Sequence, residues 1–185
     1  HKVRPVPPPY RRSGTRELFS LGGPRGLIHV VRGPRQVGKT TALYQLVEEM
    51  LRQGAHPRSL MLVRFDLPPF RELGLLPIVR WHADMMRSLG LEQAPLLLLD
   101  EVHKLRGWDE QVKHVYDTFA VRIALTGSSS VLVARGQRES LAGRTTTVDF
   151  PPFRFREVLE AWYPDGLDAA PHPAKLQDFL DPVSY

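Results

Sequence analysis

The sequence has 185 residues, of which 42% are hydrophobic and 24% are charged, with a net charge of +5. This length and composition predict one globular domain with a substantial core. The longest apolar run is too short to cross a membrane and no signal peptide is expected, so a cytoplasmic protein is predicted. The absence of cysteine excludes disulfides, cysteine zinc sites and thiol nucleophiles.

The net charge is concentrated at the N-terminus. The first acidic residue, Glu17, is preceded by five basic residues: Lys2, Arg4, Arg11, Arg12 and Arg16. Since the whole chain has 25 basic and 20 acidic residues, the remainder is neutral overall. The prolines between positions 5 and 9 favour an extended polyproline form. We interpret residues 1–20 as a leader. It is either a solvated segment that runs along the domain, which we favour, or a basic arm for nucleic acid or an acidic protein partner.

Residues 33–40 fit the pattern G-x-x-x-x-G-K-[ST] of loops that bind nucleotide phosphates. The apolar run 27–31 predicts a buried parallel strand before this loop, and apolar residues at helical spacing over 43–51 predict a helix after it. This order lets the main-chain N–H groups of the loop and the positive end of the helix dipole converge on a polyphosphate. Lys39 is expected to reach the β- and γ-phosphates, and the Thr40 hydroxyl is expected to hold Mg²⁺. The predicted nucleotide-binding residues are Gly33, Pro34, Arg35, Gln36, Val37, Gly38, Lys39, Thr40 and Thr41, the last of which also suits packing or capping.

Residues 60–65 predict a second strand, which ends at Asp66. We expect Pro68 and Pro69 to break the chain there. The next helix is predicted from about residue 77 to residue 89, with Gly90 as its stop. Asp66 is placed either to line a site at the strand end or to cap the following turn, and we favour the cap.

Residues 96–101 consist of four leucines followed by Asp100 and Glu101. They predict a third strand that brings two carboxylates to the carboxyl edge of the sheet, where open α/β sheets bind their ligands. Asp100 is the expected partner of Mg²⁺, and Glu101 is placed to polarise a water for attack on the γ-phosphate. The alternative is a buried strand that ends in a solvated acidic turn. A helix with one apolar face is predicted over 108–119.

The rest of the chain continues the alternation of strands and helices. A fourth strand is predicted over 121–126 and a fifth over 146–150, with short helices over about 129–135, 155–162 and 175–180. Strands that alternate with helices predict an α/β fold, in which a parallel sheet has helices on both faces.

Five blocks of this sequence together resemble the AAA+ ATPases, in particular a bacterial and archaeal branch of them. The blocks are GPRQVGKTT, LLLLDEVHKLRGW, ALTGSSS, ESLAGR and PPFRFRE, and they cover roughly residues 25–160. The resemblance implies a P-loop NTPase three-layer sandwich with a five-stranded parallel sheet in the AAA+ order 5-1-4-3-2. It also implies ATP and Mg²⁺ at the carboxyl edge of that sheet. An ATPase core is expected over 21–165, and a C-terminal helix with the start of a missing lid or C-terminal region over 166–185.

The resemblance assigns a role to the end of the fourth strand. Thr126 and Ser128 are similar in position to the sensor that hydrogen-bonds the γ-phosphate or the attacking water. The alternative is that this serine-rich stretch caps the next helix.

Arg144 stands just before the fifth strand, where AAA+ proteins often place an arginine finger. A finger usually acts on the site of a neighbouring subunit, so the resemblance implies a homo-oligomer in which Arg144 acts in trans. The alternatives are a surface ion pair between Arg144 and Glu139, or a finger at Arg135 or Arg138.

The predicted function is an ATP-binding and ATP-hydrolysing AAA+ domain. Water would attack the γ-phosphate in line, with Lys39 and Mg²⁺ neutralising charge and Glu101 orienting the water. The alternative is an ATP-dependent switch or scaffold with little intrinsic hydrolysis, for which DNA is one partner to consider. A helicase motor, suggested by the text from Asp100 to His103, would need a second ATPase-like domain. A small-molecule kinase fits an acidic pair and a serine sensor less well than a hydrolase does.

Overall fold

The computed structural model describes residues 10–12, 14–15, 18, 26–128 and 140–162 of the chain. The chain divides into two compact units, His1–Pro152 and Phe153–Tyr185. The second unit contains helix α7 (Phe155–Trp162), as predicted. The boundary predicted at residue 165 and the helices predicted at 129–135 and 175–180 lie outside the described residues. Within those ranges, no helix has both the length and the apolar character needed to cross a membrane.

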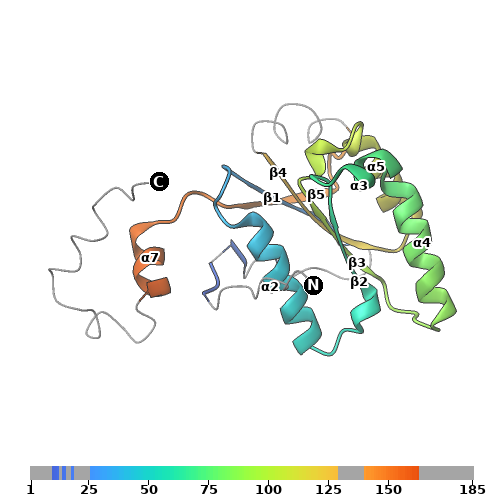
Figure 1. The fold of residues 1–185 in the computed structure, drawn as a ribbon, viewed down its shortest axis with the longest axis horizontal. Coiled ribbons are helices and arrows are strands. Elements are labelled where there is room, and N and C mark those ends of the chain that lie inside the picture. The colour runs from blue at the N-terminus through green and yellow to red at the C-terminus, as the bar shows by residue number, and fades with distance from the viewer. Residues whose placement is uncertain (1–9, 13, 16–17, 19–25, 129–139, 163–185) are drawn as a thin grey trace, which may run out of the picture. The chain divides into compact units, whose positions relative to one another are not determined.

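The first unit is built on a five-stranded parallel sheet (Figure 1). Its strands are β1 (Ile28–Gly33), β2 (Leu60–Arg64), β3 (Leu96–Asp100), β4 (Arg122–Ser128) and β5 (Thr145–Asp149). They are ordered β2-β3-β4-β1-β5, which is the predicted order 5-1-4-3-2 seen from the other edge. The predicted AAA+ P-loop fold is therefore confirmed. Because every pairing is parallel, the carboxyl ends of all five strands meet at one edge of the sheet.

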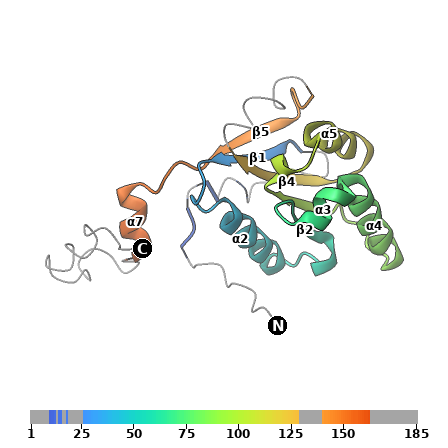
Figure 2. The ribbon, with the colours of Figure 1, turned by 45° about the horizontal axis from the view of Figure 1, so that its top comes forward.

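Helices cover both faces of this sheet, so each face is buried (Figure 2). Helix α2 (Lys39–Arg52) packs on one face, and α4 (Leu75–Ser88) and α5 (Trp108–Thr118) pack on the other. The leucines of β3 divide between the two cores: Leu96 and Leu98 belong to the core with α2, and Leu97 and Leu99 to the core with α4 and α5. This alternation explains why a central strand can be apolar at every position.

Helix α3 (Pro68–Leu73) was not predicted, and the expectation that Pro68 and Pro69 break the chain is wrong. Both prolines lie in the first turn of α3. A proline is tolerated there because first-turn N–H groups have no partner within the helix, and because its fixed φ is already helical. No residue of α3 is buried, so the helix lacks the apolar face by which the sequence analysis recognised the others.

Part of the predicted leader packs against the sheet instead of remaining in solvent. Arg12, Thr15 and Leu18 are 6%, 1% and 0% exposed, and Leu18 belongs to the core with α2. Both interpretations of the leader left its basic side chains accessible, and for Arg12 this is wrong because its guanidinium donates to buried main-chain carbonyls. Arg11 pairs with Glu48 and Glu49 on α2, and the other basic residues of the leader, Lys2, Arg4 and Arg16, lie outside the described part of the chain.

Candidate functional site

A cleft of about 540 Å³ lies at the carboxyl edge of the sheet. Its lining comes from the carboxyl ends of β2, β3 and β4 and from the segments that follow β1, β2 and β3. The ends of parallel strands converge at this edge. The lining residues are Arg35, Gln36, Gly38, Lys39, Thr40, Thr41, Arg64, Asp66, Asp100, Glu101, Lys104 and Ser128. Nine of these twelve residues were predicted as site residues, so the fold brings the phosphate-loop motif and the acidic strand end into one hollow.

The loop between β1 and α2 adopts the left-handed backbone conformation at two positions. Gln36 has φ +63° and Gly38 has φ +89°, and Gly38 is the N-cap of α2. A Cβ added to Gly38 would meet nothing within 4 Å, so open space borders this part of the loop. Such alternation of backbone conformation turns successive N–H groups toward a common point and forms an anion-binding concavity. The loop therefore suits a phosphate group at the start of α2.

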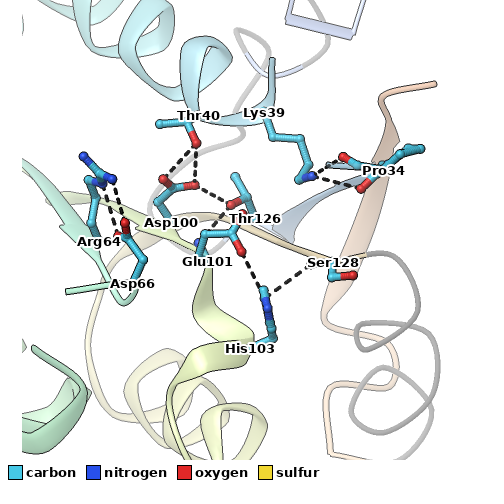
Figure 3. A network of polar contacts seen from close by, with 11 residues as sticks. Pro34, Lys39, Thr40, Arg64, Asp66, Asp100, Glu101, His103, Thr126 and Ser128 are labelled. Atoms are coloured by element: carbon cyan, nitrogen blue, oxygen red, sulfur yellow. Dashed lines mark hydrogen bonds and ion pairs between the residues drawn. The ribbon is translucent and has the colours of Figure 1, made fainter. Parts of the chain in front are cut away.

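Lys39 lies at the floor of the cleft with its ammonium group close to the loop's own carbonyls (Figure 3). Its Nζ donates to Gly33 O at 2.9 Å and to Pro34 O at 2.6 Å. Burial lowers the pKa of Lys39, and the charges of Glu101 and Asp100 oppose that shift. A desolvated cation held only by neutral carbonyls gains stabilisation when an anion approaches. Gly33 and Pro34 thus contribute acceptors to Lys39.

Val37 is one of three predicted loop residues, with Gly33 and Pro34, that do not line the cleft. Its side chain is 6% exposed and belongs to the apolar core with α2. The isopropyl group of valine is more stable in that apolar core than beside a polyphosphate. Only its main chain remains available to the loop.

Asp100 is a buried carboxylate that accepts hydrogen bonds from two hydroxyls. Thr40 Oγ1 donates to Asp100 Oδ2 at 2.9 Å, and Thr126 Oγ1 donates to Asp100 Oδ1 at 2.6 Å. Asp100 is 1% exposed and Thr126 is fully buried, so Thr126 holds the carboxylate from within the protein interior. Hydroxyl and carboxylate oxygens are the ligands that Mg²⁺ prefers, usually together with water and substrate phosphates. No group of three or more His, Cys, Asp or Glu side chains with metal-binding geometry occurs among the described residues.

Glu101 follows Asp100 in a strained backbone conformation, with φ +53°. Its main-chain N–H donates to Thr126 Oγ1 at 3.0 Å. Its carboxylate lies 3.5 Å from His103 Nδ1, and the same Nδ1 accepts a hydrogen bond from the Ser128 N–H at 3.3 Å (Figure 3). Burial lowers the pKa of His103, and the charge of Glu101 opposes that shift. Because Nδ1 accepts from the Ser128 N–H, the ring proton of the neutral imidazole is on Nε2. His103 therefore links the acidic strand end to the end of β4, a role that the sequence analysis did not predict.

A second ion pair borders the cleft at the end of β2. Arg64 donates to Asp66 through Nε at 3.2 Å and through Nη2 at 2.7 Å. Asp66 lines the cleft, and the N-cap of α3 is Leu67, so the preferred interpretation of Asp66 as a cap is wrong. The two-atom fork of arginine holds the carboxylate more firmly than a turn N–H would. Lys104 adds an exposed cation that the sequence analysis did not identify.

Arg144 lies at the opposite edge of the sheet from the cleft. The register pairs Thr145 with Ile28, so Arg144 stands beside the amino end of β1. Its guanidinium donates to Asp117 through Nε at 3.0 Å and Nη2 at 3.2 Å. Arg144 does not reach the cleft of its own chain, and any action as a finger requires a second copy. The alternatives Arg135, Arg138 and Glu139 lie outside the described residues.

The chain is similar in sequence to a protein family and to several curated proteins. A family model described as an AAA domain matches residues 25–159. The chain is 31% identical over 152 residues to the uncharacterized protein MJ1637 of Methanocaldococcus jannaschii, a match that covers 81% of this chain and 29% of that protein. It is 25% identical over 142 residues to an uncharacterized protein of Haemophilus influenzae, with 72% of this chain and 33% of that protein covered. The chain thus spans about a third of the length of these curated relatives.

Solved structures share the fold at low sequence identity. DnaA from Aquifex aeolicus, bound to AMPPCP, superimposes with a TM-score of 0.58 at 17% identity, covering 90% of this chain and 54% of that one. A DNA replication initiation factor superimposes with a TM-score of 0.51, also at 17% identity, covering 92% of this chain and 50% of that one. These similarities extend to the arrangement of the strands and helices.

Proposed function

The chain belongs to the AAA domain family and has the fold of the AAA+ ATPases, a nucleotide-binding ATPase type of domain, and on this premise we propose that its cleft binds ATP with Mg²⁺ and hydrolyses the γ-phosphate. One observation carries the proposal. A phosphate-type loop with a buried lysine, a threonine–aspartate pair and a neighbouring glutamate all line the same cleft.

Substrate binding would change the partners of Lys39. Its ammonium group now rests on two carbonyl oxygens, and the β- and γ-phosphate oxygens offer it full negative charge. The N–H groups of the loop and of the first turn of α2 would bind the same phosphates. Mg²⁺, held by Thr40 and Asp100, would supply positive charge to the triphosphate.

Hydrolysis would depend on Glu101. The oxygen of a water attacks the γ-phosphorus while its proton passes to the Glu101 carboxylate, and the bond from the γ-phosphorus to the bridging oxygen breaks. ADP and inorganic phosphate leave as products. Thr126 holds the main chain of Glu101 in place by accepting a hydrogen bond from its N–H. Ser128 lines the cleft beside it and is our choice for the sensor of the γ-phosphate.

A switch with little intrinsic hydrolysis is the second candidate, and the position of Arg144 favours it. The guanidinium is paired with Asp117 at the far edge of the sheet, so an isolated chain lacks this charge at its cleft. A finger contributes about 10³–10⁵ in rate where it is used. Under this candidate, the rate of phosphate release per chain rises steeply with protein concentration, because only assembled copies complete the site. A rate independent of concentration in an active protein would exclude it.

The proposal is tested by changing Glu101 to glutamine. Glu101→Gln is expected to retain ATP binding and to lower the rate of phosphate release by about a hundredfold or more, because the amide cannot accept the proton. Glu92→Gln is the matched control, since it makes the same change at an exposed position before the amino end of β3. Turnover at the wild-type rate in Glu101→Gln would remove Glu101 from this role.

A further inference from the structure

The buried side chain of Arg12, in the segment before the sheet, contacts the phosphate loop. Its Nη1 donates to Val37 O at 2.9 Å, and its Nη2 donates to Pro151 O at 2.9 Å. The guanidinium carbon also lies 5.4 Å from the centre of the Phe150 ring, a distance at which a cation and an aromatic face attract each other. Arg12 therefore joins three stretches of chain: the N-terminal segment, the phosphate loop and the residues after β5.

The contact with Val37 bears directly on the anion-binding amides. The C=O of Val37 and the N–H of Gly38 belong to one peptide unit, and in a trans peptide they point in opposite directions. No cis peptide occurs in the described residues. Holding Val37 O toward Arg12 therefore directs the Gly38 N–H away from Arg12. Gly38 lines the cleft at the start of α2, where amide N–H groups bind phosphate.

Close packing also fixes the residues after β5, which accept the second hydrogen bond from Arg12. Phe150 N–H donates to Arg32 O at 2.8 Å, and a Cβ on Gly33 would lie only 2.1 Å from Phe150 O. The residues after β5 therefore pack against the start of the loop. This packing fixes the position of Pro151 O, which accepts the hydrogen bond from Arg12 Nη2. Lysine has a single point charge and cannot donate in this planar, two-ended geometry. The arrangement calls for arginine in particular.

We propose that Arg12 is a positioning residue for phosphate binding, which orients the Gly38 amide by holding the preceding carbonyl. The proposal rests on the proposed function, because it names a group that prepares the same cleft for a nucleotide. It also assigns a structural purpose to a basic residue of the leader.

The test is a titration of the full chain with ADP in the absence of Mg²⁺, so that only phosphate-loop and base contacts are measured. Arg12→Ala and Arg12→Lys are both expected to weaken ADP binding about tenfold or more, the equivalent of one charge-assisted hydrogen bond. Arg11→Ala is the neighbouring control, because it removes the adjacent arginine, whose guanidinium forms ion pairs with Glu48 and Glu49 on α2. It is expected to keep the wild-type affinity.

A second control separates positioning from general stability. Val115→Ala removes buried volume from α5 on the other face of the sheet and lowers stability without touching the loop. If it keeps the ADP affinity while the Arg12 variants lose it, the inference holds. Wild-type affinity in both Arg12 variants, or an equal loss in Val115→Ala, overturns it. A wild-type protein that binds no ADP would instead overturn the proposed function, and this inference with it.

Discussion

Among single residues, Thr126 connects the acidic pair at the end of β3. Its hydroxyl donates to the Asp100 carboxylate and accepts from the Glu101 N–H, both in a fully buried position. These contacts occupy the hydroxyl, and Ser128, two residues further along β4, lines the cleft, so we propose Ser128 as the sensor. We therefore propose that Thr126 holds the Asp100 carboxylate and the Glu101 main chain.

Replacing Thr126 by valine tests this role. Thr126→Val keeps the shape of the side chain but leaves a buried carboxylate oxygen and a main-chain N–H without their partner. The free energy of unfolding is expected to fall by about 1–3 kcal/mol in urea titrations. Thr118→Val, at the exposed end of α5, is the control and is expected to change it by less than about 0.5 kcal/mol. Equal stability of the two variants would refute the role.

Single site residues were predictable where the motif itself is contiguous. The positions of Lys39, Thr40 and Asp100 follow from two short runs of sequence and from the rule that parallel strands end at one edge. Arg12 was not predictable in the same way. It donates to main-chain carbonyls, one of them 139 residues away in sequence. Every residue has a main-chain carbonyl, so the amino-acid sequence does not indicate which one accepts.

At the scale of elements, the contact of β1 with the end of β5 sets the base of the phosphate loop. Gly33 ends β1, and the main chain of Phe150 approaches it more closely than any side chain would permit. The glycine that the motif assigns to phosphate binding is thus also required for the packing of two strand ends. This second requirement became visible only with the pairing of β1 and β5.

Adding one methyl group at this position measures that requirement. Gly33→Ala is expected to lower the free energy of unfolding by about 3 kcal/mol or more, because its Cβ overlaps a carbonyl oxygen that strand pairing fixes. Gly54→Ala is the control: its φ of +87° costs about 1–2 kcal/mol, but its Cβ meets nothing within 4 Å. Chemical denaturation compares the two, and a smaller loss for Gly33→Ala would contradict the packing argument.

The strands and the long helices followed from the sequence because each buries a periodic apolar face. Helix α3 has none, and its exposed apolar residues, Phe70 and Leu73, gave no helical pattern to detect. The parallel order of the strands was expected from the family resemblance, since burial patterns alone do not fix which strands are neighbours.

At the scale of the whole molecule, two of the imidazoles that the structure describes are buried without full hydrogen bonding. Nδ1 of His29 and of His82 has no partner within the described part of the chain. Burial lowers the pKa of both, and for His82 a hydrogen bond to Arg58 O opposes the shift. Both are therefore neutral in the folded protein at pH values where an exposed histidine begins to charge.

This predicts how stability depends on pH. Below about pH 6.5 the unfolded chain binds protons at these histidines before the folded protein does, so the free energy of unfolding falls as the pH falls toward the lower folded pKa values. Urea titrations between about pH 7 and about pH 5 measure the fall. These pH values lie above the ordinary pKa range of carboxylates, so the histidines dominate the change. His82→Gln keeps a donor for Arg58 O and is expected to show a smaller fall. A fall as large as that of the wild type, or a rise in stability, would contradict the argument.

The most direct test of the central claim is the affinity of the full chain for ATP with Mg²⁺, measured calorimetrically for the wild type and for Lys39→Ala. The wild type is expected to bind one ATP per chain. Lys39→Ala is expected to lose about a hundredfold or more in affinity, because the only buried ammonium described at the cleft is removed. Lys113→Ala, on α5, is the control and is expected to bind as the wild type does. The same ATP affinity in the wild type and in Lys39→Ala would contradict the assignment of this cleft.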